Sequence, residues 1–101
     1  MAATIPAAST EYLHGLVTAS VPLDTQVVEV AFITPSGSNP DDTTAWITAA
    51  WTGTAANQRT WQLLIGPGSA TPLAVGSYGV WCRVHDDPEI PVRKHDVLTI
   101  Q

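Results

Sequence analysis

The chain has 101 residues and a formal net charge of −5; 45% of its residues are hydrophobic and only 13% are charged. This length is typical of one domain, and the hydrophobic content is too high for a disordered chain. Four basic residues are too few for a nucleic-acid groove, and no apolar run approaches the roughly 20 residues that a membrane-spanning helix needs.

The cysteine content and the first residues bear on where the protein is made. The single cysteine, Cys82, excludes an internal disulfide and a cysteine-rich zinc site. The segment from Met1 to Leu16 has neither the basic start nor the apolar centre of a secretory signal. We therefore expect synthesis in a cytoplasm, where the chain stays at least until assembly.

Seven glycines and eight prolines interrupt the chain at short intervals, which leaves no window long enough for an amphipathic helix. Residues 1–10 are rich in Ala, Pro and Thr and are expected to form an N-terminal arm. Residues 11–101 are expected to form one domain. Its predicted strands are Tyr12–Ala19, Thr25–Ile33, Trp46–Trp51, Arg59–Ile65, Ser77–His85 and Val92–Ile100.

Alternation of apolar and other side chains indicates which face of each strand is buried. Val28, Val30 and Phe32 alternate with residues expected to point outward. The strand Trp46–Trp51 places its two tryptophans on opposite faces. In the strand Ser77–His85, the expected inward side chains are Tyr78, Val80, Cys82 and Val84, and the expected outward residues are Gly79, Trp81, Arg83 and His85. The pattern predicts an all-β, immunoglobulin-like antiparallel β-sandwich of about seven strands.

A short motif supports this fold class. Leu73, Gly76 and Tyr78 stand immediately before the clearest strand, as an apolar plug, a turn residue and an inward-facing tyrosine. This order is typical of the tyrosine corner of immunoglobulin-like sandwiches, in which the phenol bonds to backbone a few residues upstream.

Several segments resemble a known class of proteins. The run Leu73–Arg83, the hairpin to Pro91-Val92 and the ending Val97–Ile100 resemble the C-terminal half of small immunoglobulin-like virion proteins of tailed bacteriophages. The strand with Tyr12-Leu13-His14 and the turn Ile65–Gly68 are similar to such proteins from phages of actinobacteria. The resemblance implies an accessory role in a capsid or tail, and it brings no catalytic residues.

Catalytic chemistry finds little support in the residues. The chain has no Gly-x-Ser-x-Gly elbow and no pattern that pairs a cysteine with a histidine. Cys82 lies on the expected inward face, so we interpret it as a structural thiol. We expect no enzymatic activity, no catalytic residue and no cofactor.

Two acidic segments contain residue types that can bind metal ions. His85, Asp86, Asp87 and Glu89, with His95 and Asp96 opposite, carry ligand types that suit a divalent cation. A solvated loop at the end of the sandwich is the favoured interpretation, and we expect no metal there. Asn39, Asp41 and Asp42 lack the spacing of an EF-hand, and Asx-turn hydrogen bonding is expected.

Outward tryptophans and low charge point to contact with other proteins. Trp81, with Arg83 on the same face and one of Trp46 and Trp51, is expected to lie on the surface, where such residues are typical interface anchors. A carbohydrate platform of tryptophans is the alternative. Thirteen threonines and thirteen alanines suit a subunit packed in an assembly.

We therefore expect a structural protein of a phage particle, assembled in the host cytoplasm, that decorates or stabilises the capsid. Its expected partners are the major capsid protein, other virion proteins and copies of itself, with the arm Met1–Thr10 laid over a neighbour. The alternatives are a neck, tail or baseplate component, and a module that binds host-surface glycan.

Overall fold

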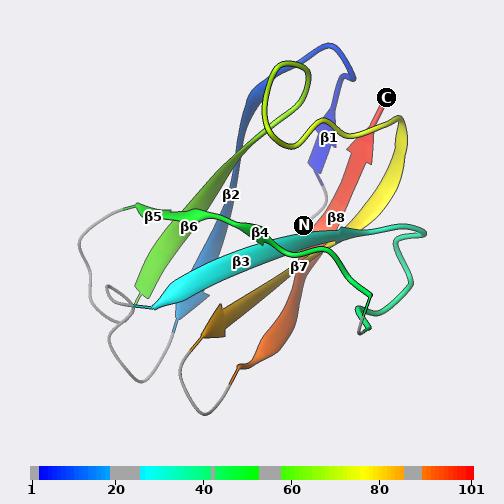
Figure 1. The fold of residues 1–101 in the computed structure, drawn as a ribbon. Helices are drawn as coiled ribbons and strands as arrows, with labels where there is room; N and C mark the ends of the chain where they lie inside the picture. Colours follow the sequence, from blue (N-terminus) through cyan, green and yellow to red (C-terminus); the bar gives the residue numbers. More distant parts are fainter. Residues whose placement is uncertain (1–2, 19–25, 42, 53–57, 86–89) are drawn as a thin grey trace.

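The computed structural model describes residues 3–18, 26–41, 43–52, 58–85 and 90–101. These residues form no helix, and their strands build two β-sheets that face each other as a sandwich (Figure 1). The predicted fold class is confirmed. The strands are β1 (Ala3–Ile5), β2 (Glu11–Thr18), β3 (Val27–Ile33), β4 (Ile47–Thr48), β5 (Ala50–Thr52), β6 (Gln58–Ile65), β7 (Gly76–His85) and β8 (Val92–Ile100).

The order of strands is that of an immunoglobulin-like domain. The five-stranded sheet has the order β1-β8-β7-β3-β4, and the three-stranded sheet has the order β2-β6-β5. In an immunoglobulin-like domain, strands C, F and G share one sheet and strands B and E lie in the other. The same arrangement appears here, with β3, β7 and β8 in the places of C, F and G, and with β2 and β6 in the places of B and E. All neighbours are antiparallel except β1 and β8, which pair in parallel. The described chain thus has eight strands and one parallel pair, where about seven antiparallel strands were expected.

The segment 46–51, expected as one strand, is divided between the two sheets. Ile47 lies in β4 and pairs with β3, whereas Trp51 lies in β5 and pairs with β6. Ala49, between the two strands, donates its backbone N–H to the Val28 carbonyl at 2.9 Å. The prediction of one continuous strand is wrong because the chain crosses here from one sheet to the other.

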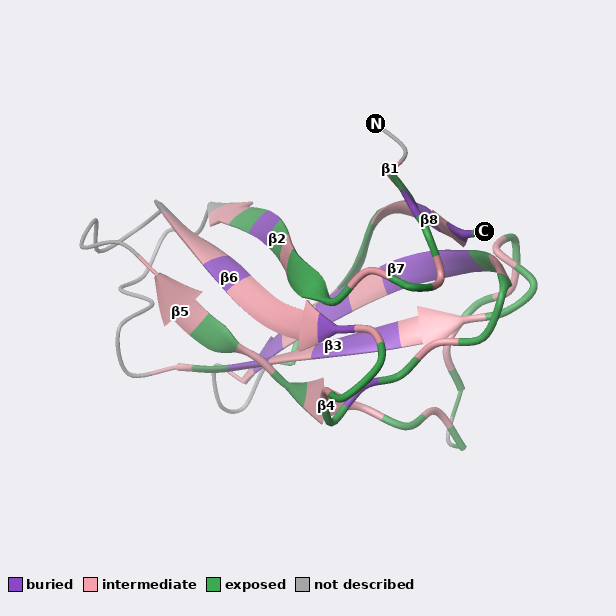
Figure 2. Cartoon of the chain, turned by 90° about the horizontal axis from the view of Figure 1, so that it is seen from above, coloured by how far each residue is buried: buried purple, intermediate pink, exposed green. Residues whose placement is uncertain are grey.

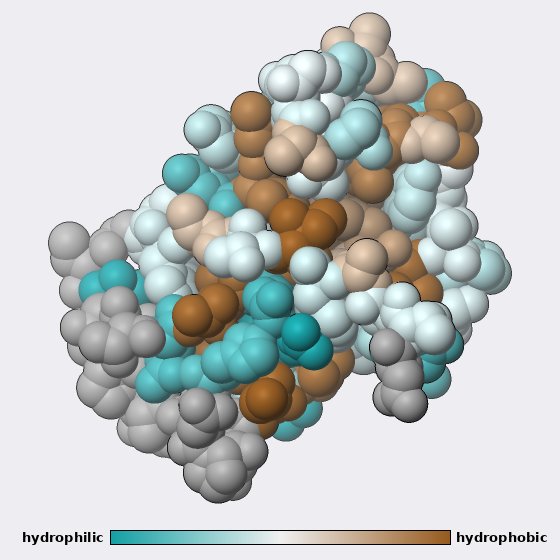
Figure 3. Space-filling model, in the orientation of Figure 1, coloured by the Kyte–Doolittle hydropathy of each residue, from teal (hydrophilic) through white to brown (hydrophobic). Residues whose placement is uncertain are grey.

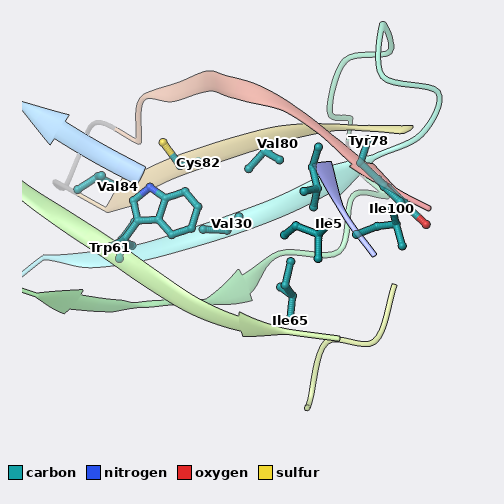
Figure 4. Packing of buried hydrophobic residues seen from close by; sticks show 11 residues of the cluster. Ile5, Val30, Trp61, Ile65, Tyr78, Val80, Cys82, Val84 and Ile100 are labelled. Atoms are coloured by element: carbon teal, nitrogen blue, oxygen red, sulfur yellow. The ribbon is translucent and has the colours of Figure 1, made fainter. Parts of the chain in front are cut away.

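The core lies between the sheets and uses alternate residues of the long strands. Figure 2 shows buried residues concentrated in β3 and β7, in the middle of the five-stranded sheet. Trp61 enters from β6 and is completely buried, so the three-stranded sheet supplies the largest core side chain. The buried cluster consists of Ile5, Val28, Val30, Trp61, Ile65, Tyr78, Val80, Cys82, Val84, Leu98 and Ile100 (Figure 4).

The described part of the N-terminal segment packs against the rest of the domain. Residues 3–5 form β1 against β8, and Ile5 is only 6% exposed in the core. The backbone N–H of Gln101 donates to the Ile5 carbonyl at 3.0 Å, and Thr10 Oγ1 donates to the Pro67 carbonyl at 2.6 Å. Residues 3–5 therefore pack on the domain, within the segment 1–10 that was expected to form an arm, because Ile5 enters the core and the open edge of β8 pairs with β1.

The tyrosine corner is present in the structure. The Tyr78 hydroxyl donates a hydrogen bond of 2.7 Å to the Ala74 carbonyl. Gly76 has a φ of +152°, in a region that favours glycine, and Leu73 packs against the core. The Phe32 ring meets the Tyr78 ring edge-on, with ring centres 6.5 Å apart. These contacts fix the start of β7 and therefore the direction of every side chain along it.

Candidate functional site

The outer face of the five-stranded sheet carries three of the four residues expected to contact another protein. The even-numbered side chains of β7 are buried in the core, so Trp81 and Arg83 lie on the outer face. Trp46, just before β4, lies beside them, and the Arg83 guanidinium carbon is 4.4 Å from the centre of the Trp46 ring. We call this surface the Trp–Arg face; it consists of Trp46, Trp81, Arg83 and the neighbouring Glu29 and His85.

Glu29, in the adjacent strand β3, holds Arg83 in position. The two residues are direct partners in the β3–β7 ladder, and Arg83 Nε donates to Glu29 Oε1 at 2.8 Å. His85 Nε2 is hydrogen-bonded to the same carboxylate oxygen. The Glu29 and Arg83 side chains are 17% and 27% exposed. An arginine fixed by a carboxylate and an aromatic ring loses little conformational freedom when a partner binds it.

The surroundings of Glu29 favour its ionised form. Burial raises the pKa of the Glu29 carboxyl, but the hydrogen bonds from His85 and Arg83 outweigh that effect and lower the pKa below its ordinary value. A carboxyl whose pKa is lower in the folded state than in the unfolded state stabilises the fold at neutral pH. That contribution is lost as the pH falls below the ordinary glutamate range, near about 4.3, and through the lowered pKa.

The substitution Glu29→Gln is expected to lower the free energy of unfolding at neutral pH by about 1 kcal/mol, because it removes the charge that His85 and Arg83 stabilise. The difference from the unmodified protein should shrink as the pH falls to about 3, where Glu29 is protonated in both states. Urea unfolding at both pH values measures this. Glu11→Gln at the exposed start of β2 is the matched control, and a difference that grows in acid would contradict the interpretation.

Trp81 is half-buried and packs beside the turn at residues 35–38. A Cβ atom at Gly79 would lie 2.8 Å from the Ser36 carbonyl oxygen and 3.2 Å from Trp81 Nε1, so only glycine leaves room for both. Lys94, from β8, donates to the same Ser36 carbonyl at 3.0 Å. Trp81 Nε1 is buried with no acceptor among the described residues. The turn therefore covers the nitrogen side of the indole, and part of the ring stays on the surface.

Trp51, the fourth residue expected at the interface, does not belong to the Trp–Arg face. It packs against the core, and its Nε1 donates to the Gln26 carbonyl at 2.7 Å. Its ladder partner is Trp61, which is completely buried. Half of the tryptophans therefore serve the interior, and the remaining two, Trp46 and Trp81, are partly exposed.

Two residues of this surface region, Glu29 and Lys94, were not predicted. Glu29 alternates with the buried Val28 and Val30 and is therefore expected to point outward, but only the register of β3 against β7 places it opposite Arg83. His85, which was expected to join Asp86, Asp87 and Glu89 in a polar cluster, is hydrogen-bonded to Glu29. The loop residues Asp86, Asp87 and Glu89 lie outside the described residues.

The other residues considered for catalysis or metal binding have structural roles, as far as the described residues show. Burial raises the pKa of the Cys82 thiol, and nearby Arg93 offsets this only in part. Such a thiol is a poor nucleophile at neutral pH. Asp41 Oδ1 accepts the backbone N–H of Thr43 at 2.9 Å, which is the expected Asx turn. The described residues contain no group of three His, Cys, Asp or Glu side chains arranged to hold a metal, and Asp42 lies outside them.

Comparison of the chain with protein-family models, with curated proteins and with solved structures finds no match. In the described part of the chain, no helix has the length and apolar character needed to cross a membrane. A proposal about function therefore depends on the fold, the Trp–Arg face and the motifs of the sequence.

Proposed function

We propose that this protein is a non-enzymatic structural component of a tailed-phage particle, which decorates or stabilises the capsid through its Trp–Arg face. The resemblance of Leu73–Arg83 and Val97–Ile100 to small virion proteins supports the setting. The sandwich fold is compatible with it, although sandwiches serve many functions. The proposal therefore depends on the face.

The observation that carries the proposal is the stacked pair of Arg83 and Trp46 beside Trp81. Arginine and tryptophan are the residue types most enriched among the side chains that dominate interface binding energy. Glu29 and His85 fix Arg83 before any partner arrives. A rigid, partly exposed group of this kind reduces the entropy lost on binding.

The low charge of the chain is consistent with a subunit that other proteins cover in an assembly. Only 13% of the residues are charged, about half the usual share of roughly 25%. In Figure 3, strongly hydrophilic side chains (teal) gather mainly in one region, and most of the other coloured surface in that view is pale or brown. A weakly charged exterior is favourable when other proteins cover it and unfavourable for a free monomer.

Three observations support a protein-binding role over the alternatives of catalysis and glycan binding. Cys82 is buried, and its thiol has a raised pKa. Of the aromatic residues that a carbohydrate platform would use, Trp61 is buried in the core and Trp51 packs partly buried against it. Arg83 covers one face of Trp46, which removes that face from sugar stacking.

The test is to purify phage particles from cells that carry the gene and to locate the chain by antibody labelling and electron microscopy. We expect the label at regular positions on the capsid shell. Label confined to the neck, tail or baseplate would overturn the capsid assignment in favour of those positions. Absence from the particles, with binding of the purified chain to cell-wall glycan, would overturn the proposal as a whole.

A further inference from the structure

The second exposed feature of the sandwich is the free edge of β2. This strand is the end of the three-stranded sheet, and among the described strands only β6 pairs with it. The β2–β6 ladder runs through eight residue pairs without a register shift, so β2 is long and regular. Such an edge presents unpaired backbone donors and acceptors and readily pairs with another strand.

The other long edge of the sandwich is protected in ways that β2 is not. Strand β1 covers β8 only along residues 98–100, and the uncovered part of β8 has a register shift against β7 and carries Arg93 and Lys94, both exposed. Irregularities and basic side chains are the usual devices that prevent pairing between edges. Strand β2 has neither Lys, Arg nor Pro. A crevice of about 460 Å³ borders it between Leu13, Gly15 and Leu16 on β2 and His95 and Val97 on β8.

The outward side chains of β2 are arranged symmetrically about its centre. Tyr12 and Leu16 are 53% and 57% exposed, and both lie two residues from His14 on the same face. The Tyr12 ring also packs on the His14 ring, with centres 6.4 Å apart. An antiparallel pairing of two identical strands centred on His14 therefore sets each Tyr12 opposite the Leu16 of the other copy.

Charge also favours a second copy as the partner. The described outward positions of the three-stranded sheet contain no Lys, Arg, Asp or Glu; they are Tyr12, His14, Leu16, Ala50, Thr52, Thr60, Gln62 and Leu64. Two chains of net charge −5 can therefore approach through a neutral surface. Glu11 of one copy would lie six residues, or about 20 Å, from Glu11 of the other, beyond a Debye length.

We propose that β2 is a self-association site, at which two copies of this chain pair antiparallel through β2, with His14 facing His14 on the two-fold axis. The two three-stranded sheets then become one continuous six-stranded sheet. Each Tyr12–Leu16 pair is expected to add cross-strand side-chain contact to the backbone hydrogen bonds. This contact lies on the sheet opposite the Trp–Arg face, so both surfaces can act at once.

The register is tested by crosslinking of single cysteines placed on the outward face. In the variant His14→Cys, the Cα atoms of the two introduced cysteines would lie about 5 Å apart, within the range that a disulfide spans. Gln62→Cys is the matched control, because Gln62 is the β6 partner of His14 and lies one strand farther from the axis. Under mild oxidation we expect His14→Cys to form a covalent dimer. The Gln62→Cys variant and the unmodified chain, whose Cys82 is buried, should stay monomeric on a denaturing gel.

Equal crosslinking of the two cysteine variants, or none in either, would overturn the pairing.

Sedimentation of the chain without added cysteines gives an independent measurement. Leu16→Lys should weaken dimerisation at least about tenfold. The change places an ammonium group opposite Tyr12 of the other copy, and a lysine on an edge strand disfavours pairing with another strand. Val75→Lys adds the same charge at a residue 71% exposed outside the sheets and should leave dimerisation unchanged. A chain that stays monomeric at all concentrations refutes self-association, and leaves the particle test of the Trp–Arg face unaffected.

Discussion

Replacing Gly15 with valine is expected to lower the free energy of unfolding by about 3 kcal/mol, a large share of the stability of a domain of this size. Gly15 lies on β2 directly opposite Trp61, and a Cβ atom there would fall 2.3 Å from the Trp61 Cε2 atom. Trp61 is completely buried, and a close-packed interior takes up added atoms only by shifting side chains or backbone. Urea unfolding followed by tryptophan fluorescence measures the loss.

Two further variants test the cause. Gly37→Ala is the control, because a Cβ at Gly37 meets no atom within 4 Å; its effect should stay within about 0.5 kcal/mol. Combining Gly15→Val with Trp61→Leu should cost less than the sum of the two single changes, since the smaller side chain relieves the overlap. Strict additivity would show that the cost of valine arises elsewhere.

If the proposed function is correct, replacing Trp46 with alanine is expected to weaken binding of the purified chain to the phage particle by about thirtyfold, or about 2 kcal/mol. The change removes an aromatic ring of the Trp–Arg face, on which Arg83 rests. The core should be unaffected, because Trp46 is outside the buried cluster. Co-sedimentation with particles that lack the protein gives the binding curve.

The control for this experiment is Val75→Ala, which shortens an apolar side chain that is 71% exposed and lies outside the sheets. It should leave binding to the particle nearly unchanged, provided that both variants show the thermal unfolding of a folded domain. Equal losses at Trp46 and Val75 would mean that binding is not concentrated on the Trp–Arg face.

The parts of the fold that could be predicted are those whose signal is local. Alternation in β7 placed Tyr78, Val80, Cys82 and Val84 in the core, and the residues around Tyr78 predicted the corner that the structure contains. These features depend on periodicity and turn chemistry within about ten residues, which a single sequence displays directly.

The features that escaped prediction depend on contacts between distant segments. The alternation of apolar and polar residues does not reveal the crossing at Ala49, because β4 and β5 are each too short to show an alternation of their own. Docking of β1 depends chiefly on Ile5, in a segment otherwise made of small residues. In the candidate site, Trp81 and Arg83 could be assigned to one face, but Glu29 could be added only once the β3–β7 register was known.

The parallel pairing of β1 with β8 also determines how the domain would respond to mechanical force. The first described strand and the last strand lie side by side and run in the same direction (Figure 1). A pull that separates the two ends of the chain would slide β1 along β8 and load the hydrogen bonds between Ile5 and Gln101 and their neighbours together. Bonds strained in shear resist more than bonds that open one after another, so this short ladder would act as the clamp that keeps the sandwich closed under tension.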